Sequence, residues 1–114
     1  SFGQQGQLAR IYQEGSNNTA VQNMDEGVVN EQYAYQYGDW NESYQTASGK
    51  YNVSTVNQDG TANFAVVDQS SEYNEASVDQ FGYGNEGVII QESNNNNANI
   101  TQTGNNNGAT VIQN

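Results

Sequence analysis

The sequence predicts an all-β fold, a β-solenoid in which stacked β-arches form a cross-β core of five two-strand rungs, about 22 residues each. Three observations lead to this prediction. A Gln-x-Gly unit recurs at a nearly constant step, apolar and polar residues alternate with a period of two between these units, and the 114 residues include no Pro. Pro is the residue that a hydrogen-bonded strand ladder accommodates least well.

The repeat is defined by Gln, a Gly two residues later and an Asn five residues later. The glutamines are Gln13, Gln36, Gln58, Gln80 and Gln102. The glycines are Gly15, Gly38, Gly60, Gly82 and Gly104, and the asparagines are Asn18, Asn41, Asn63, Asn85 and Asn107. Residues 1–6 are thus an N-terminal flank, and residues 7–114 hold five repeats, at 7–24, 30–47, 52–69, 74–91 and 96–113.

Each repeat reads as a strand, a tight arc and a second strand. The Gly in the arc is expected to take a positive φ, which a residue without Cβ adopts freely. A second arc joins each repeat to the next, and it has four residues at 48–51, 70–73 and 92–95. Its first copy, 25–29, has five, which explains why Gln13 and Gln36 lie 23 residues apart whereas the later steps are 22.

The alternation within each strand sorts side chains into inward and outward sets. If the two strands of a rung face each other across the arc, large residues meet small ones: Val56 meets Ala65, for example. The sheets can then approach closely, as in dry zippers. The predicted apolar core is Ile11, Val56, Val67, Val78, Ile89, Ile100 and Val111.

The repeated amides need hydrogen-bond partners, because a buried carboxamide without them is costly. Stacking at a constant step supplies partners. Each Gln lies above the Gln of the preceding rung and donates its amide N–H to the next carbonyl, while the five Asn form a second ladder. We expect these ten amides to hold the stack in register, since a mere abundance of Gln and Asn would not keep step through five units.

Composition alone would indicate disorder, because the apolar content is 33% and the net charge is -11. It also argues against several functions. Without Cys or His, the chain offers no disulfide, no thiolate and few groups for catalysis or metal binding. With only Arg10 and Lys50 as cations, nucleic acid is not an expected partner. No apolar run reaches the roughly 20 residues of a membrane helix, so we expect no membrane insertion, no cofactor and no enzyme activity.

The unit, written amide-x5-Q-x-G-x2-N-x5-Q, resembles the curlin repeat of bacterial curli subunits. All five units take part, over residues 7–113. Two departures are specific. The opening Ser of the family is Gln or Asn here, and its closing Gln is replaced by Met24 and Ala47 in the first two units.

The resemblance implies a structural subunit that is secreted through an outer-membrane channel, nucleated at the cell surface by a nucleator subunit, and added head to tail to extracellular amyloid fibres of the biofilm matrix. The chain begins Ser1-Phe2-Gly3 without Met or the apolar segment of a signal peptide, so we expect an already processed form. The acidic composition and regular last unit favour the major subunit. A nucleator-type minor subunit and a monomeric solenoid adhesin of the cell surface are the alternatives.

Overall fold

The computed structural model describes residues 8–113, and in this range the chain is built from β-strands joined by tight arcs. The strands are β1 (Leu8–Glu14), β2 (Thr19–Val28), β3 (Glu31–Asp39), β4 (Glu42–Lys50), β5 (Val53–Thr61), β6 (Phe64–Glu72), β7 (Glu75–Tyr83), β8 (Glu86–Gln91), β9 (Asn97–Asn105) and β10 (Gly108–Gln113). The all-β class is confirmed.

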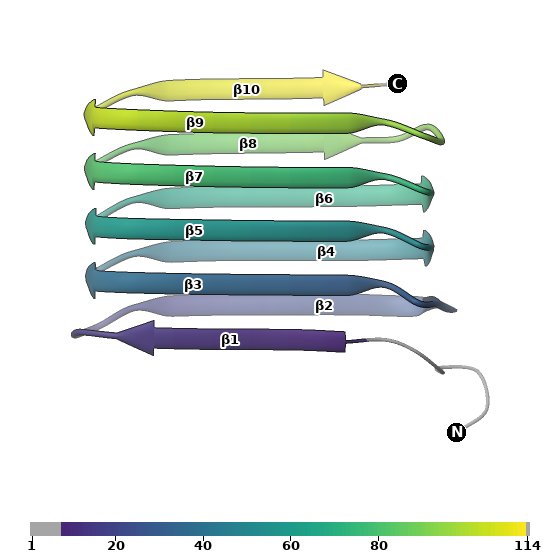
Figure 1. Cartoon of the computed structure of the whole chain (residues 1–114), viewed down its shortest axis with the longest axis horizontal. Helices are drawn as coiled ribbons and strands as arrows, with labels where there is room; N and C mark the ends of the chain where they lie inside the picture. Colours follow the sequence, from purple (N-terminus) through teal and green to yellow (C-terminus); the bar gives the residue numbers. More distant parts are fainter. Residues whose placement is uncertain (1–7, 114) are drawn as a thin grey trace.

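The strands form two parallel sheets that lie face to face (Figure 1). The first sheet has the order β1-β3-β5-β7-β9, and the second has the order β10-β8-β6-β4-β2. Consecutive strands of the chain therefore alternate between the sheets. Each pair of strands is one rung, and five rungs stack into the β-solenoid that the repeat predicts.

The register between rungs is constant, so that equivalent residues of successive repeats lie side by side. Gln36 pairs with Gln58, and Gln58 pairs with Gln80, each 22 positions further along the chain. The one irregularity lies between β2 and β4, where the register shifts between Met24 and Gly27. This is the position of the five-residue arc, and the shift returns the next strands to the common step.

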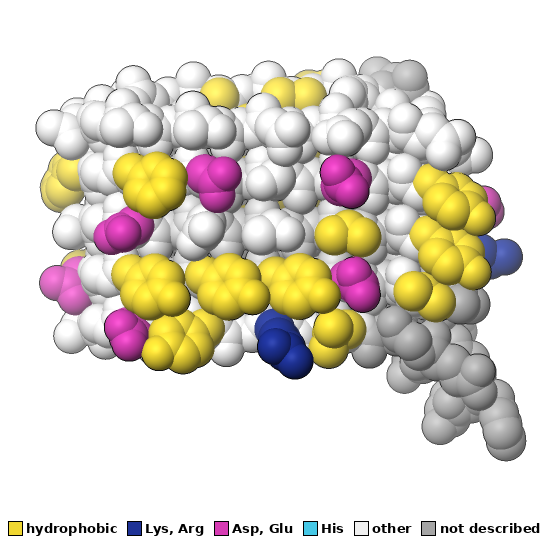
Figure 2. Space-filling model, viewed as in Figure 1, with side chains coloured by type: hydrophobic (Ala, Val, Ile, Leu, Met, Phe, Trp, Pro, Cys, Tyr) yellow, Lys and Arg dark blue, Asp and Glu magenta, His cyan; other side chains and the backbone are white. Residues whose placement is uncertain are grey.

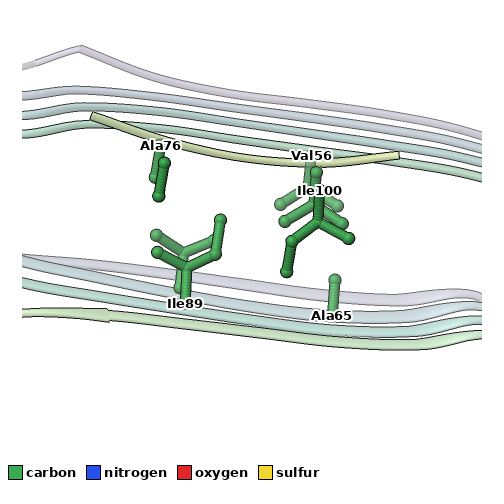
Figure 3. Close-up of a cluster of buried hydrophobic side chains, with 8 residues drawn as sticks. Val56, Ala65, Ala76, Ile89 and Ile100 are labelled. Carbon is green, nitrogen blue, oxygen red and sulfur yellow. The ribbon is translucent and has the colours of Figure 1, made fainter. Parts of the chain in front are cut away.

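The alternation of buried and exposed residues follows the parity that the sequence predicts. In β5, Ser54, Val56 and Gln58 are buried, whereas Val53, Thr55 and Asn57 between them are partly exposed. Large inward residues face small ones across the rung, as Figure 3 shows for Ala76 over Ile89 and for Val56 over Ala65. This fit lets the two sheets approach closely.

The arcs hold residues in left-handed backbone conformations, and several of these are not Gly. Trp40 has a φ of 61° and Ala62 has a φ of 58°. Such values are uncommon for residues with a Cβ. Hydrogen bonds between rungs hold them there, since the Trp40 N–H donates to the Ser16 carbonyl at 3.0 Å and the Ala62 N–H donates to the Asp39 carbonyl at 2.9 Å.

The Gly of the Gln-x-Gly unit is required for a second reason besides its positive φ, which is 130° at Gly60. The backbone of the next rung lies directly against its Cα, and a Cβ built at Gly60 would overlap the Gly82 carbonyl. Gly104, the equivalent glycine of the last rung, has a similar φ of 114°, but only the Asn107 side chain lies near the corresponding position, at 3.5 Å. The two glycines are a matched pair for testing close stacking.

We predict that Gly60→Ala destabilises the folded chain by several kcal/mol, whereas Gly104→Ala meets only the strain of its positive φ, about 1–3 kcal/mol. The measurement is the guanidinium midpoint of the β-structure followed by circular dichroism. Similar losses in the two variants would contradict close stacking at the arc.

Candidate functional site: amide ladders and the two end faces

The five glutamines of the Gln-x-Gly unit form one hydrogen-bonded column through the whole stack. Each side-chain Nε2 donates to the Oε1 of the next rung. The N–O distances are 2.6 Å from Gln13 to Gln36, 2.8 Å from Gln36 to Gln58, 2.9 Å from Gln58 to Gln80 and 2.9 Å from Gln80 to Gln102. All the donors point towards the C-terminal rungs, so the column has a direction.

From Gln36 onwards, the second proton of each amide is donated to a backbone carbonyl of the opposite sheet. Gln58 Nε2 donates to the Glu42 carbonyl at 2.8 Å, and Gln80 Nε2 donates to the Phe64 carbonyl at 2.9 Å. Both of these side chains are fully buried. The column therefore links the rungs along the stack and the two sheets across it, with no amide proton of these two residues left unused.

The five asparagines stack differently from the glutamines. In the first four rungs, the Oδ1 of the Asn accepts a hydrogen bond from the backbone N–H of the Asn in the next rung, as Asn41 Oδ1 does from Asn63 at 3.0 Å. The Nδ2 donates to the carbonyl of the turn Gly in the next rung, as Asn41 does to Gly60 at 3.1 Å. This ladder thus joins side chain to backbone. It also provides a partner for the carbonyl of the glycine whose Cα is closely stacked.

Two further amide columns lie at the other arc and were not among the candidate residues, although they share the 22-residue spacing. One is Asn30, Asn52, Asn74 and Asn96, which repeats the side-chain-to-backbone pattern with N–O distances of 3.0 to 3.1 Å. The other is Gln69, Gln91 and Gln113, which repeats the amide-to-amide pattern with distances of 3.0 and 2.9 Å. Each rung from the third onwards is therefore bounded by amides at both arcs.

The column that ends in Gln113 stops at Ala47, because Met24 and Ala47 occupy its first two positions. Gln69 Oε1 is buried and has no hydrogen-bond partner among the described residues. In the column that begins at Gln13, the equivalent oxygen, Gln58 Oε1, accepts a hydrogen bond from the Gln36 Nε2 of the preceding rung. The departure from the repeat thus leaves an unsatisfied acceptor inside the protein.

The second rung has a polar interior. Gln32, Ser43 and Gln45 are buried at positions where later rungs carry smaller or apolar residues. Gln45 Nε2 donates to Ser54 Oγ at 3.0 Å, but Gln32 Oε1 has no partner. This rung therefore buries less apolar area than the later rungs. Because burial of apolar area stabilises the folded state by about 25 cal/mol per Å², the second rung gains less stability from burial.

The apolar core is formed by rungs three to five. Val56, Val67, Val78, Ile89 and Ile100 are buried, and Val111 lies partly buried against them. The assignment of Ile11 to the buried core is wrong, because its side chain is 48% exposed. Ile11 pairs with Ala34 in the inward column, but β1 is an edge strand among the described residues and nothing described there covers it.

A comparison with protein families matches the curlin associated repeat at residues 73–104. This segment includes Gln80, Gly82, Asn85, Gln91 and Gln102, the most regular part of both glutamine columns. Residues 73–104 are thus similar to the curlin associated repeat, and the other units share its Gln-x-Gly spacing. Comparison with curated proteins gives no significant match. The curlin repeat and the solenoid fold are structural and not enzymatic.

The outward face of the solenoid carries aromatic rings near its N-terminal end (Figure 2). Tyr33, Tyr35 and Tyr37 follow one another on β3, and the ring of Tyr12 on β1 contacts that of Tyr37 at a centroid distance of 5.8 Å. The Tyr12 hydroxyl donates to Glu14 Oε2 at 3.0 Å, and this hydrogen bond and the carboxylate charge raise the pKa of Tyr12. The Tyr12 and Tyr37 rings are tilted by 45° to each other, so these two rungs are in contact on the outside, away from the core.

Carboxylates on the outer face are spaced so that like charges do not stack directly. Glu31 and Glu75 share one column with Val53 between them, and Glu42 and Glu86 share another with Phe64 between them. Two rungs separate the charges by about 9.6 Å, close to the Debye length at physiological salt. In residues 8–113, no cluster of three His, Cys, Asp or Glu could hold a metal ion, and no helix is long and apolar enough to span a membrane.

We predict that Gln58→Leu slows assembly and lowers fibre yield far more than Thr55→Ala does. Loss of the Gln58 amide removes the partners of a Gln36 donor and of the Gln80 Oε1, at about 1–3 kcal/mol for each buried group, and removes the hydrogen bond to the Glu42 carbonyl. Thr55 lies outward on the same strand. Lag times followed by thioflavin fluorescence provide the measurement, and equal lag times would show that the amide column does not hold the stack.

We also predict that a peptide of residues 96–113 assembles faster than one of residues 30–47 under identical conditions. The first carries Ile100 and Val111 inward, whereas the second carries Gln32 and Gln45, so it buries less apolar surface. Faster assembly of the second peptide would mean that its outward tyrosines, or its amides, outweigh apolar burial.

Proposed function

We propose that this chain is the structural subunit of a secreted functional-amyloid fibre of the curli type, which polymerises with copies of itself into extracellular matrix at the cell surface. The observation that carries the proposal is the pair of end faces. The N-terminal face is formed by β1 and β2, and the C-terminal face by β9 and β10. Within the described residues, each of these four strands has a neighbour on one side only.

The two faces are complementary because every ladder has a direction. Gln102 Nε2 uses one proton on the Glu86 carbonyl, and its other proton has no acceptor among the described residues. At the other end, Gln13 donates to Gln36, and its own Oε1 has no described donor. A C-terminal face stacked on an N-terminal face brings this donor to this acceptor. Two identical faces would bring donor to donor or acceptor to acceptor.

The asparagine ladder favours the same arrangement. Asn107 Nδ2 donates within its own rung to the Thr103 carbonyl, as Asn18 does to Glu14. Asn18 also donates to the Gly38 carbonyl of the next rung, and Asn107 has no such rung within its own chain. A second copy placed in register would supply the Gly15 carbonyl to Asn107. Addition from rung 5 to rung 1 therefore continues the pattern found between the rungs of one chain.

Exposed strand edges are a ready template for another chain, and here they are neither charged nor bulged on the C-terminal face. The inward residues of β9 are Ala98, Ile100 and Gln102, and those of β10 are Ala109, Val111 and Gln113. Secretion through an outer-membrane channel and nucleation by a second subunit come with the curli-type proposal and rest on the repeat family alone.

We predict that the purified chain, followed by thioflavin fluorescence, assembles after a lag and that its fibres give a meridional reflection at about 4.8 Å. The measurement distinguishes the alternatives. A chain that stays monomeric in size-exclusion chromatography while keeping its β-structure would contradict the fibre proposal and favour a solenoid adhesin. A chain that assembles poorly but shortens the lag of another curlin-repeat subunit would favour the nucleator role.

A further inference from the structure

Gln102 and Gln113 occupy equivalent places in the last rung, one in each sheet. Gln102 accepts a hydrogen bond from Gln80 at 2.9 Å and donates to the Glu86 carbonyl at 2.9 Å. Gln113 accepts from Gln91 at 2.9 Å and donates to the Asn97 carbonyl at 3.0 Å. Within one chain, each of the two amides therefore accepts one hydrogen bond from the preceding rung and donates one to a backbone carbonyl. Each keeps one proton directed to the C-terminal face.

Their neighbours across a junction between copies differ. If the register found between rungs continues into a second copy, Gln102 opposes Gln13 and Gln113 opposes Met24. Gln13 offers an amide oxygen, whereas Met24 offers a thioether, which is a weak acceptor. The first glutamine column runs through the junction without a break. The second is interrupted there by two rungs, since Ala47 follows Met24 in the column.

The inward residues repeat this contrast between the two sheets. In the first sheet, Ile100 would cover Ile11, whose side chain is 48% exposed in the single chain. In the second sheet, Val111 would oppose Gln22, whose Oε1 is buried without a partner. A Val side chain has no donor for that oxygen. Polar and apolar groups are thus matched on one side of the junction and mismatched on the other.

We propose that successive copies are joined through the sheet β1-β3-β5-β7-β9, and that the other sheet forms a weak seam at every junction. This inference rests on the proposed function, because it concerns how two copies meet. It identifies Met24, Ala47 and Gln22 as the residues that make the seam, and Ile11 and Gln13 as those that hold the junction.

The gap that Met24 and Ala47 leave in the second glutamine column is accompanied by a large inward residue, Gln32, in the other sheet. Its Nε2 reaches across the arch to the Asn23 carbonyl at 3.3 Å, beside Met24. In the third rung, Ser54 stands at the position of Gln32 and Gln69 at the position of Ala47. In each of these two rungs, a Gln in one strand thus accompanies a small residue in the other: Gln32 with Ala47, and Gln69 with Ser54. Restoring the glutamine column therefore requires Gln32→Ser together with Ala47→Gln.

The first test compares Gln102→Met with Gln113→Met in the full chain, by elongation of preformed wild-type seeds. The substitutions remove matched hydrogen bonds within the chain, so a difference reports on the junction. We expect Gln102→Met to slow elongation about tenfold or more, equivalent to about 1.4 kcal/mol, and Gln113→Met to slow it about threefold or less. Equal slowing, or a larger effect of Gln113→Met, would overturn the inference.

The second test restores the missing ladder. The triple variant Gln32→Ser/Ala47→Gln/Met24→Gln should form fibres that dissociate at a higher guanidinium concentration than those of the double variant Gln32→Ser/Ala47→Gln. The double variant is the control. Because Met24→Gln also adds a hydrogen bond to residue 47 within the chain, the gain is assigned to the junction only where the fibre midpoint rises by more than the unfolding midpoint of the monomer. Identical midpoints would overturn the seam. A wild-type chain that never elongates would overturn the proposed function as well, which distinguishes the two failures.

Discussion

The structure depends on one constraint, a constant register that places each buried carboxamide beside an identical one in the next rung. An amide taken into a protein interior without partners is destabilising, and here the partner of Gln58 is Gln36 on one side and Gln80 on the other. The same register places Gly60 against Gly82, so the close stacking at the arc and the ladder in the core require each other. The small apolar core can suffice because the amides contribute hydrogen bonds in every rung.

This constraint explains why the chain folds although its composition indicates disorder. Buried glutamine and asparagine take over part of the role that aliphatic residues have in an ordinary domain, and the solenoid keeps charged residues outside, with like charges two rungs apart. The same logic gives the stack a direction. A ladder that runs from Nε2 to Oε1 ends in a donor at one face and an acceptor at the other, and a second copy stacked in the same register would supply a partner for each.

Much of the fold could be predicted from the sequence, because a period of two and a step of 22 residues are visible in it. The parity at Ser54, Val56 and Gln58 and the extra residue between Met24 and Gly27 follow from spacing alone. Other features could not be predicted, since they depend on atoms and not on residue types. Examples are the hydrogen bond that Asn41 Oδ1 accepts from a backbone N–H, the Gln69 Oε1 without a partner and the left-handed backbone conformation of Trp40. The prediction that Ile11 is buried is wrong because the alternation along a strand indicates which way a side chain points, and not whether another residue covers it.

The central claim, that a directed amide ladder joins one copy to the next, is tested most directly by solid-state NMR on fibres assembled from a mixture of ¹³C-labelled and ¹⁵N-labelled chains. Contacts between the two labels can arise only between copies. The account predicts contacts between the Gln102 side chain of one copy and the Gln13 side chain of another, in the first sheet. Contacts of Gln13 with Gln13, or of Gln102 with Gln102, would contradict it, since they require identical faces to meet.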